Sequence, residues 1–151
     1  MTLIMRPVRK FWTLSSILLA AAGATLVIAG LYFILVRPPL LPEDVRYMAL
    51  PTAQLDAVKL PLESWLAHVF VVMGGYVLAT GVLTIALAAT SFRAHHWGAA
   101  VGALIGGAAS IGLMAVVNFV INSDFKWVLL GMALLWACSL ALFWLEKSQR
   151  A

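Results

Sequence analysis

Four long stretches of the chain carry no Asp, Glu, Lys or Arg, and this feature limits its fold more than any other. They cover residues 11–36, 65–92, 97–120 and 127–145. An α-helix needs about 20 mostly apolar residues to cross the hydrocarbon core of a bilayer. The sequence therefore predicts an all-α integral membrane protein, in which four transmembrane helices form a four-helix bundle.

The composition excludes an ordinary water-soluble domain. Of 151 residues, 64% are hydrophobic and 11% are charged, whereas a soluble domain carries roughly 25% charged residues. The single cysteine, Cys138, excludes an internal disulfide and a site with several cysteine ligands. We therefore treat residues 1–151 as one transmembrane domain.

The positions of the basic residues predict the orientation. Short connections at residues 93–96 and 121–126 make the neighbouring helices antiparallel. Six of the ten basic residues then fall on the side of the two termini: Arg6, Arg9, Lys10, Arg93, Lys147 and Arg150. The positive-inside rule places this side, with both termini, in the cytoplasm. We expect a bacterial inner (plasma) membrane, lipids as partners of the basic side, and no nucleic acid.

The first apolar stretch has an alternative interpretation as a cleaved secretory signal. Basic residues precede it, and Ala22-Gly23-Ala24 fits a cleavage site. The apolar run nevertheless continues to residue 36, beyond the length of a signal core. We therefore expect an anchored helix.

Residues 37–64 form the longest polar segment and are predicted to be the outer loop. Pro42, followed by Glu43 and Asp44, suits the first turn of a short helix. A second short helix is expected at Pro51, with Thr52 as its N-cap, and Pro61 is expected to open the second transmembrane helix. The prediction is a helical cap over the outer end, in which Glu43 and Arg46 either form a local ion pair or belong to a recognition surface.

Glycines recur at regular spacing in three of the apolar stretches. They are Gly23 and Gly30 in the first, Gly74 and Gly81 in the second, and Gly98, Gly102 and Gly106 in the third. Small residues let transmembrane helices approach closely. The seven-residue spacing predicts a tight antiparallel pair of the first two helices. The four-residue stripe is either used inside one bundle or docks a second copy or another membrane subunit.

Several polar side chains within or beside the apolar stretches are candidates for ligand binding. They are His68, Tyr76, Thr80, Asn118, Asn122 and Arg46. Buried polar groups near a membrane need partners, so those at the outer end could converge on an outward-facing pocket, and the deeper ones could contact a lipid or quinone. The alternative is that they satisfy nearby backbone groups, as Thr does with its own i−4 carbonyl. His95 and His96, beside Arg93, are expected to be solvated at the lipid headgroups.

The sequence carries no motif for catalysis or for a resident cofactor. Walker, HExxH, GxSxG and paired-carboxylate patterns are absent. His68 and His95 lie roughly 40 Å apart along a helix, at 1.5 Å per residue, so they cannot share a haem iron. We therefore predict no catalytic residue and no metal, and no cofactor other than a bound lipid or quinone. A small oligomeric channel or transporter and a membrane enzyme are further alternatives.

The run Gly74-Gly75-Tyr76-Val77-Leu78-Ala79-Thr80-Gly81, which follows a proline-bearing outer loop, resembles the small DoxX-like bacterial membrane proteins. The similarity covers roughly residues 20 to 90. Some members of that family are linked with respiratory or thiol-redox partners. The resemblance implies a four-helix inner-membrane fold and a subunit role, but it carries over no catalytic residue, and the single Cys138 argues against thiol chemistry by this chain. The leading hypothesis is a non-enzymatic accessory or interaction subunit of a larger membrane complex. The alternative is a lipid- or quinone-binding membrane protein with an outward-facing pocket.

Overall fold

The computed structural model describes residues 12–149, and no strand occurs among them. The first half of the chain forms α1 (Leu14–Leu35), α2 (Pro42–Met48), α3 (Thr52–Leu87) and the π-helical turn η1 (Ala88–Phe92). The second half forms α4 (Trp97–Gly107), the π-helical turn η2 (Ala108–Gly112), α5 (Leu113–Val120) and α6 (Lys126–Ser148). The predicted all-α class is confirmed.

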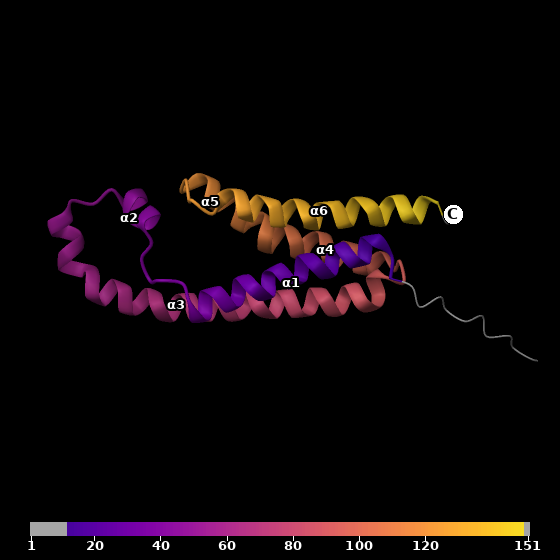
Figure 1. The fold of residues 1–151 in the computed structure, drawn as a ribbon, viewed down its shortest axis with the longest axis horizontal. Coiled ribbons are helices and arrows are strands. Elements are labelled where there is room, and N and C mark those ends of the chain that lie inside the picture. Colours follow the sequence, from indigo (N-terminus) through magenta and orange to yellow (C-terminus); the bar gives the residue numbers. More distant parts are fainter. Residues whose placement is uncertain (1–11, 150–151) are drawn as a thin grey trace, which may run out of the picture.

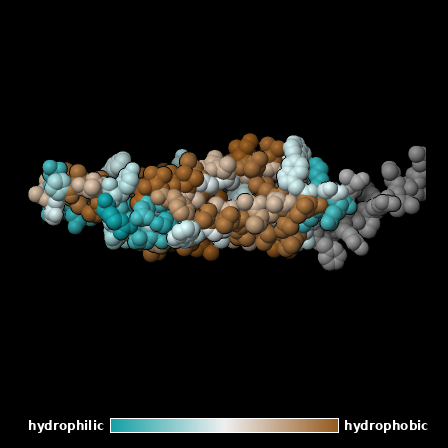
Figure 2. Space-filling view, turned by 90° about the horizontal axis from the view of Figure 1, so that it is seen from above, coloured by the Kyte–Doolittle hydropathy of each residue, from teal (hydrophilic) through white to brown (hydrophobic). Residues whose placement is uncertain are grey.

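Four helical rods in this part of the chain are long and apolar enough to cross a membrane. They are Leu14–Leu35, Thr52–Phe92, Trp97–Val120 and Lys126–Ser148. The rods run along the long axis of the molecule (Figure 1), and hydrophobic residues cover its middle while hydrophilic ones gather toward its ends (Figure 2). Large apolar side chains such as Leu83, Ile105 and Val128 point outward. Such a surface suits hydrocarbon, so the chain is a multi-pass membrane protein with a helical bundle.

The α1 and α3 helices approach each other most closely at their glycines. A methyl group added at Gly30 would lie 2.6 Å from the backbone nitrogen of Leu78, and one added at Gly81 would lie 2.6 Å from the carbonyl oxygen of Gly23. No side chain larger than hydrogen fits at such distances. The two series at seven-residue spacing therefore face each other, as their spacing predicts.

The α6 helix packs on α4 through a buried tryptophan. The ring of Trp136 lies where any side chain at Gly107 would be, and its indole N–H donates to the carbonyl oxygen of Ala103 at 2.9 Å. Toward one end, Phe92 and Phe143 are fully buried, with ring centroids 4.7 Å apart. The glycine at position 107 thus leaves room for the indole ring of Trp136 in the core.

The boundaries expected for the outer loop are wrong over residues 52–64. Helix α3 begins at Thr52 and continues through Pro61, where the sequence predicted a helix start, and Pro51 rather than Thr52 is the N-cap. A proline inside a helix leaves the i−4 carbonyl unpaired and favours a bend. That carbonyl belongs to Ala57, which is exposed, and α3 bends along its N-terminal part (Figure 1). Helix α2, in contrast, begins at Pro42 as predicted.

Candidate functional site: a polar network at one end of the bundle

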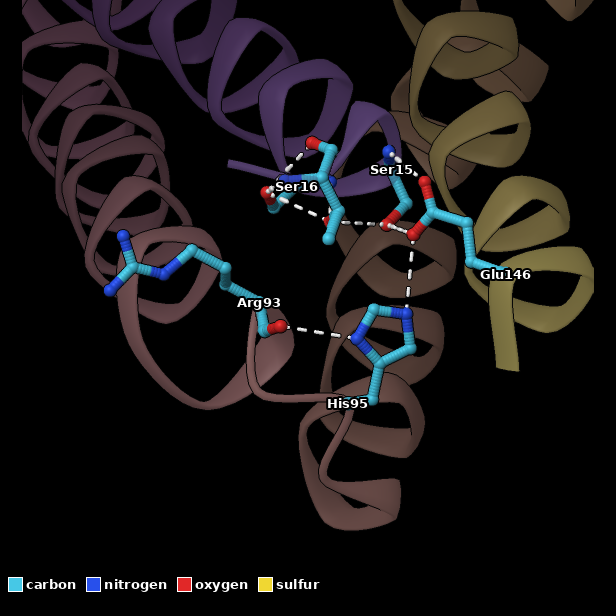
Figure 3. A network of polar contacts seen from close by, with 6 residues as sticks. Ser15, Ser16, Arg93, His95 and Glu146 are labelled. Atoms are coloured by element: carbon cyan, nitrogen blue, oxygen red, sulfur yellow. Dashed lines mark hydrogen bonds and ion pairs between the residues drawn. The ribbon is translucent and has the colours of Figure 1, made fainter. Parts of the chain in front are cut away.

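Side chains from three distant segments meet where α1 begins, α6 ends and α3 turns into α4. We call this the basic end, because Arg93 lies in the α3–α4 turn and Lys147 lies near the end of α6. The group of side chains that meets there is named the basic-end network, and it consists of Thr13, Ser15, Ser16, His95 and Glu146 (Figure 3). Its contacts join segments that lie far apart in the sequence, up to 131 residues between Ser15 and Glu146.

Helix α1 starts at this end because of a local capping box. The Thr13 hydroxyl accepts the backbone N–H of Ser16 at 3.3 Å, and the Ser16 hydroxyl accepts the backbone N–H of Thr13 at 3.1 Å. Reciprocal bonds of this kind satisfy two of the donors that a helix N-terminus leaves without partners. The backbone N–H of Ser15, between them, is directed at α6.

Glu146 of α6 completes the N-terminus of α1. Its carboxylate accepts the backbone N–H of Ser15 at 3.1 Å and the Ser15 hydroxyl at 2.6 Å (Figure 3). An anion is favoured there because the N–H groups and the helix dipole present positive charge. Glu146 therefore links the first turn of α1 to the last turns of α6.

His95 brings the α3–α4 turn into the same network. Its Nε2 lies 3.2 Å from the Glu146 carboxylate, and its Nδ1 donates to the carbonyl oxygen of Arg93 at 3.1 Å. The ring stacks on Phe143, with centroids 4.8 Å apart, and only 8% of the side chain is exposed. The expectation that His95 is solvated is wrong, although His96 is exposed.

The contacts of His95 hold its backbone in an unfavourable conformation. Its φ of 58° lies in the left-handed region, which costs a residue with a Cβ roughly 1–3 kcal/mol. Nδ1 lies beside the Arg93 carbonyl and Nε2 beside the Glu146 carboxylate, so the ring is held between the α3–α4 turn and α6. The network fastens three helix ends together. No group of three His, Cys, Asp or Glu side chains within the described residues could hold a metal ion.

The opposite end of the bundle carries the cap, which docks on the α5–α6 turn. Arg46 donates to the carbonyl oxygen of Asn122 at 3.1 Å and to Asp124 at 3.3 Å. Glu43 is 3% exposed and accepts the Ser123 hydroxyl at 3.3 Å. The local ion pair expected between Glu43 and Arg46 is therefore wrong, because each bonds the turn between α5 and α6 instead.

Arg37 also holds the cap in place, a role that no local pattern in the sequence predicts. Its guanidinium pairs with Asp44 at 3.1 Å and lies over the Phe70 ring, 3.5 Å from the centroid. The side chain is 8% exposed. A buried, stacked and paired arginine fixes the geometry of the groups around it, so Arg37 connects the end of α1 to α2 and α3.

Three of the six predicted ligand-binding residues donate to the backbone of their own helix. His68 donates to Ser64, Thr80 to Tyr76 and Asn118 to Met114, each to a carbonyl oxygen four residues earlier. Tyr76 is itself 73% exposed. Among the six candidates, the described contacts join two pairs: Thr80 with the Tyr76 carbonyl inside one helix, and Arg46 with the Asn122 carbonyl between the cap and the α5–α6 turn. The side chain of Asn122 accepts from Lys126.

The glycine stripe of α4 differs from the other glycine series. A methyl group added at Gly98, Gly102 or Gly106 would meet nothing within 4 Å. A groove of about 200 Å³ lies beside it, between α3 and α4, and it is lined by Thr80, Leu83, Thr84, Leu87, Gly102, Ala103, Gly106 and Trp136. Among the described residues, the stripe is therefore not used for packing against another helix.

No protein-family model, curated protein or solved structure matches this chain. Its class accordingly comes from the fold alone, which is that of a multi-pass helical membrane protein. The DoxX-like resemblance of residues 74–81 stays a prediction from the sequence.

Proposed function

We propose that this protein is a non-enzymatic accessory or interaction subunit of a membrane complex, and that its contact surface is the α4 stripe of Gly98, Gly102 and Gly106. One observation supports the proposal: these glycines are open, while a side chain at Gly23, Gly30, Gly74 or Gly81 would meet the backbone of the facing helix. The partner is another membrane subunit or a second copy. We further propose a bacterial inner membrane with both termini in the cytoplasm, from the position of the basic residues.

Transmembrane helices associate in lipid for a different reason than helices do in water. Hydrocarbon tails are as apolar as leucine side chains, so contact depends on close backbone approach. Glycine costs a helix up to about 1 kcal/mol relative to alanine. At Gly30 and Gly81 this cost is offset by contact with the facing helix. At Gly102 the bundle supplies no such contact, and a helix from outside would supply it.

Enlarging one stripe glycine tests the proposal. Gly102→Leu should abolish co-purification of a partner, or of a second tagged copy, from native membranes in mild detergent. Gly75→Leu is the matched control, because a side chain at Gly75 also meets nothing within 4 Å but lies on α3. Both variants should unfold at the temperature of the unmodified protein. The proposal would be contradicted if the unmodified protein purified in mild detergent as a monomer without a partner. Equal loss of the partner in both variants would also contradict it.

The groove between α3 and α4 favours a second candidate, the binding of a lipid or quinone. Its lining includes Thr80, a ligand-binding residue predicted from the sequence. It also includes Thr84, whose hydroxyl donates to the Thr80 carbonyl at 2.8 Å. Thr80→Leu would fill the groove from α3 and should lower the amount of lipid or quinone that mass spectrometry finds with the purified protein. Thr90→Leu is the control, since Thr90 is exposed and makes a similar bond to Ala86. Equal amounts in both variants would remove this candidate.

A further inference from the structure

A second groove runs between α4 and α6 on another side of Trp136. Its volume is about 200 Å³, and its lining includes Leu104, Ala108, Ile111, Ala133, Ala137 and Leu140. These side chains carry no polar group. It is distinct from the groove between α3 and α4, with which it shares only Trp136. We call this groove the α4–α6 seam.

Aromatic rings and one cation lie beside the seam at the basic end. Trp97 of α4 and Trp144 of α6 make an edge-to-face contact with centroids 4.7 Å apart. The ammonium group of Lys147 lies over Trp97, 5.1 Å from its centroid. Both rings are about half exposed, at 51% and 50%. Tryptophan in this position is typical of the level of the lipid headgroups.

Helix periodicity places this aromatic and basic cluster on the same face as the seam. Trp97 and Leu104 are seven residues apart in one helical rod, and so are Leu140 and Lys147, with Trp144 between them. Seven residues are two turns, or roughly 10 Å. A molecule that touches Lys147 with a charged group could therefore place an apolar chain in the seam, roughly 10 Å farther along the same face.

The charge of Lys147 is not neutralised by its neighbour in sequence. The Glu146 carboxylate is turned toward α1 and the α3–α4 turn, where it accepts from Ser15 and lies 3.2 Å from His95. The basic-end network thus directs the only acidic group of the last turns of α6 away from the seam. What faces a ligand at this end is a cation among exposed indole rings.

We propose that the α4–α6 seam binds one anionic phospholipid from the leaflet at the basic end, with its phosphate at Lys147 and one acyl chain in the groove. The charge of Lys147 selects an anionic headgroup over a zwitterionic one, and the apolar lining holds hydrocarbon. This inference uses neither the α4 glycine stripe nor the groove between α3 and α4. It therefore stands or falls independently of the proposed function.

The headgroup contact is tested by native mass spectrometry after exposure to equal amounts of phosphatidylglycerol and phosphatidylcholine with identical acyl chains. The unmodified protein should retain one phosphatidylglycerol in preference. Lys147→Gln should lower that preference about fivefold, the effect of one cation at a lipid surface. Lys126→Gln, at the other end of α6, is the matched control and should keep the preference. Equal retention of the two lipids, or the same preference in both variants, would overturn the proposal.

The acyl-chain contact is tested in the same measurement by filling the groove. Ala137→Leu from α6 and Ala108→Leu from the α4 side should each lower the bound phosphatidylglycerol several-fold. Ala141→Leu is the control, because Ala141 is exposed on α6 but does not line the seam. Thermal unfolding of each variant establishes that it is folded. If one of the two groove variants does not fold, the other provides the test. Retention that matches the Ala141→Leu control would overturn the proposal, as would binding of a second copy of the chain in place of the lipid.

Discussion

At the scale of single residues, Glu146 makes the contact on which the basic end depends. Its carboxylate bonds both polar hydrogens of Ser15 and faces the imidazole of His95. Hydrogen bonds to a charged acceptor are stronger than bonds between neutral groups, and leaving their partners unsatisfied is costly. The stability of this end should therefore be sensitive to the charge at position 146.

Glu146→Gln should lower the free energy of unfolding by about 1–2 kcal/mol, allowing for partial solvent screening of this end. The measurement is the unfolding midpoint in detergent. Asp56→Asn is the control, because Asp56 is exposed, and its change should stay within about 0.5 kcal/mol. Equal midpoints in the two variants would mean that the carboxylate contributes nothing to folding.

A sequence reveals such a site only in part. The spacing of Thr13 and Ser16 is a local capping pattern and can be recognised along the chain. The contact between Ser15 and Glu146 spans 131 residues, so it depends on how the first and last helices pack. His95 stands beside basic residues in a short turn, a pattern that indicates solvent; its burial follows from stacking on Phe143, which no local rule contains.

At the scale of helices, the contact between α1 and α3 is set by backbone approach at glycine. Gly30→Ala should lower the free energy of unfolding by about 1–3 kcal/mol, because its methyl group would lie 2.6 Å from the Leu78 nitrogen and force the helices apart. Gly75→Ala adds the same methyl group in open space and should leave stability unchanged or raise it by up to about 1 kcal/mol. The unfolding midpoints of the two variants are compared. A larger loss of stability in the Gly75→Ala variant than in the Gly30→Ala variant would contradict close backbone approach at Gly30.

The helices also show where local rules suffice and where they fail. A seven-residue repeat of small residues identifies Gly23, Gly30, Gly74 and Gly81 as contact positions, because two turns return to one face. The same rule cannot say whether the α4 stripe is used inside the bundle, since that depends on where α6 packs. The sequence predicts a helix start at Pro61, yet α3 passes through it, since the helix on both sides tolerates one missing hydrogen bond.

At the scale of the whole molecule, polar contacts fasten the bundle at its two ends while apolar side chains cover the middle. The basic-end network ties α6 to α1 and to the α3–α4 turn. At the opposite end, Arg46 and Glu43 of the cap bond the turn between α5 and α6. Between these ends, the outward-facing side chains are those that hydrocarbon accepts (Figure 2). The account therefore requires that the two ends lie on opposite sides of a membrane.

Cysteine labelling tests this requirement most directly. In a Cys138→Ser background, Asp56→Cys and Ser148→Cys place one thiol on the cap side and one at the basic end. A maleimide that does not cross membranes should label the Asp56→Cys variant in intact cells, and the Ser148→Cys variant only after permeabilisation. Labelling of both variants from the same side, or a polypeptide that stays soluble without detergent, would contradict a bundle that crosses the membrane four times.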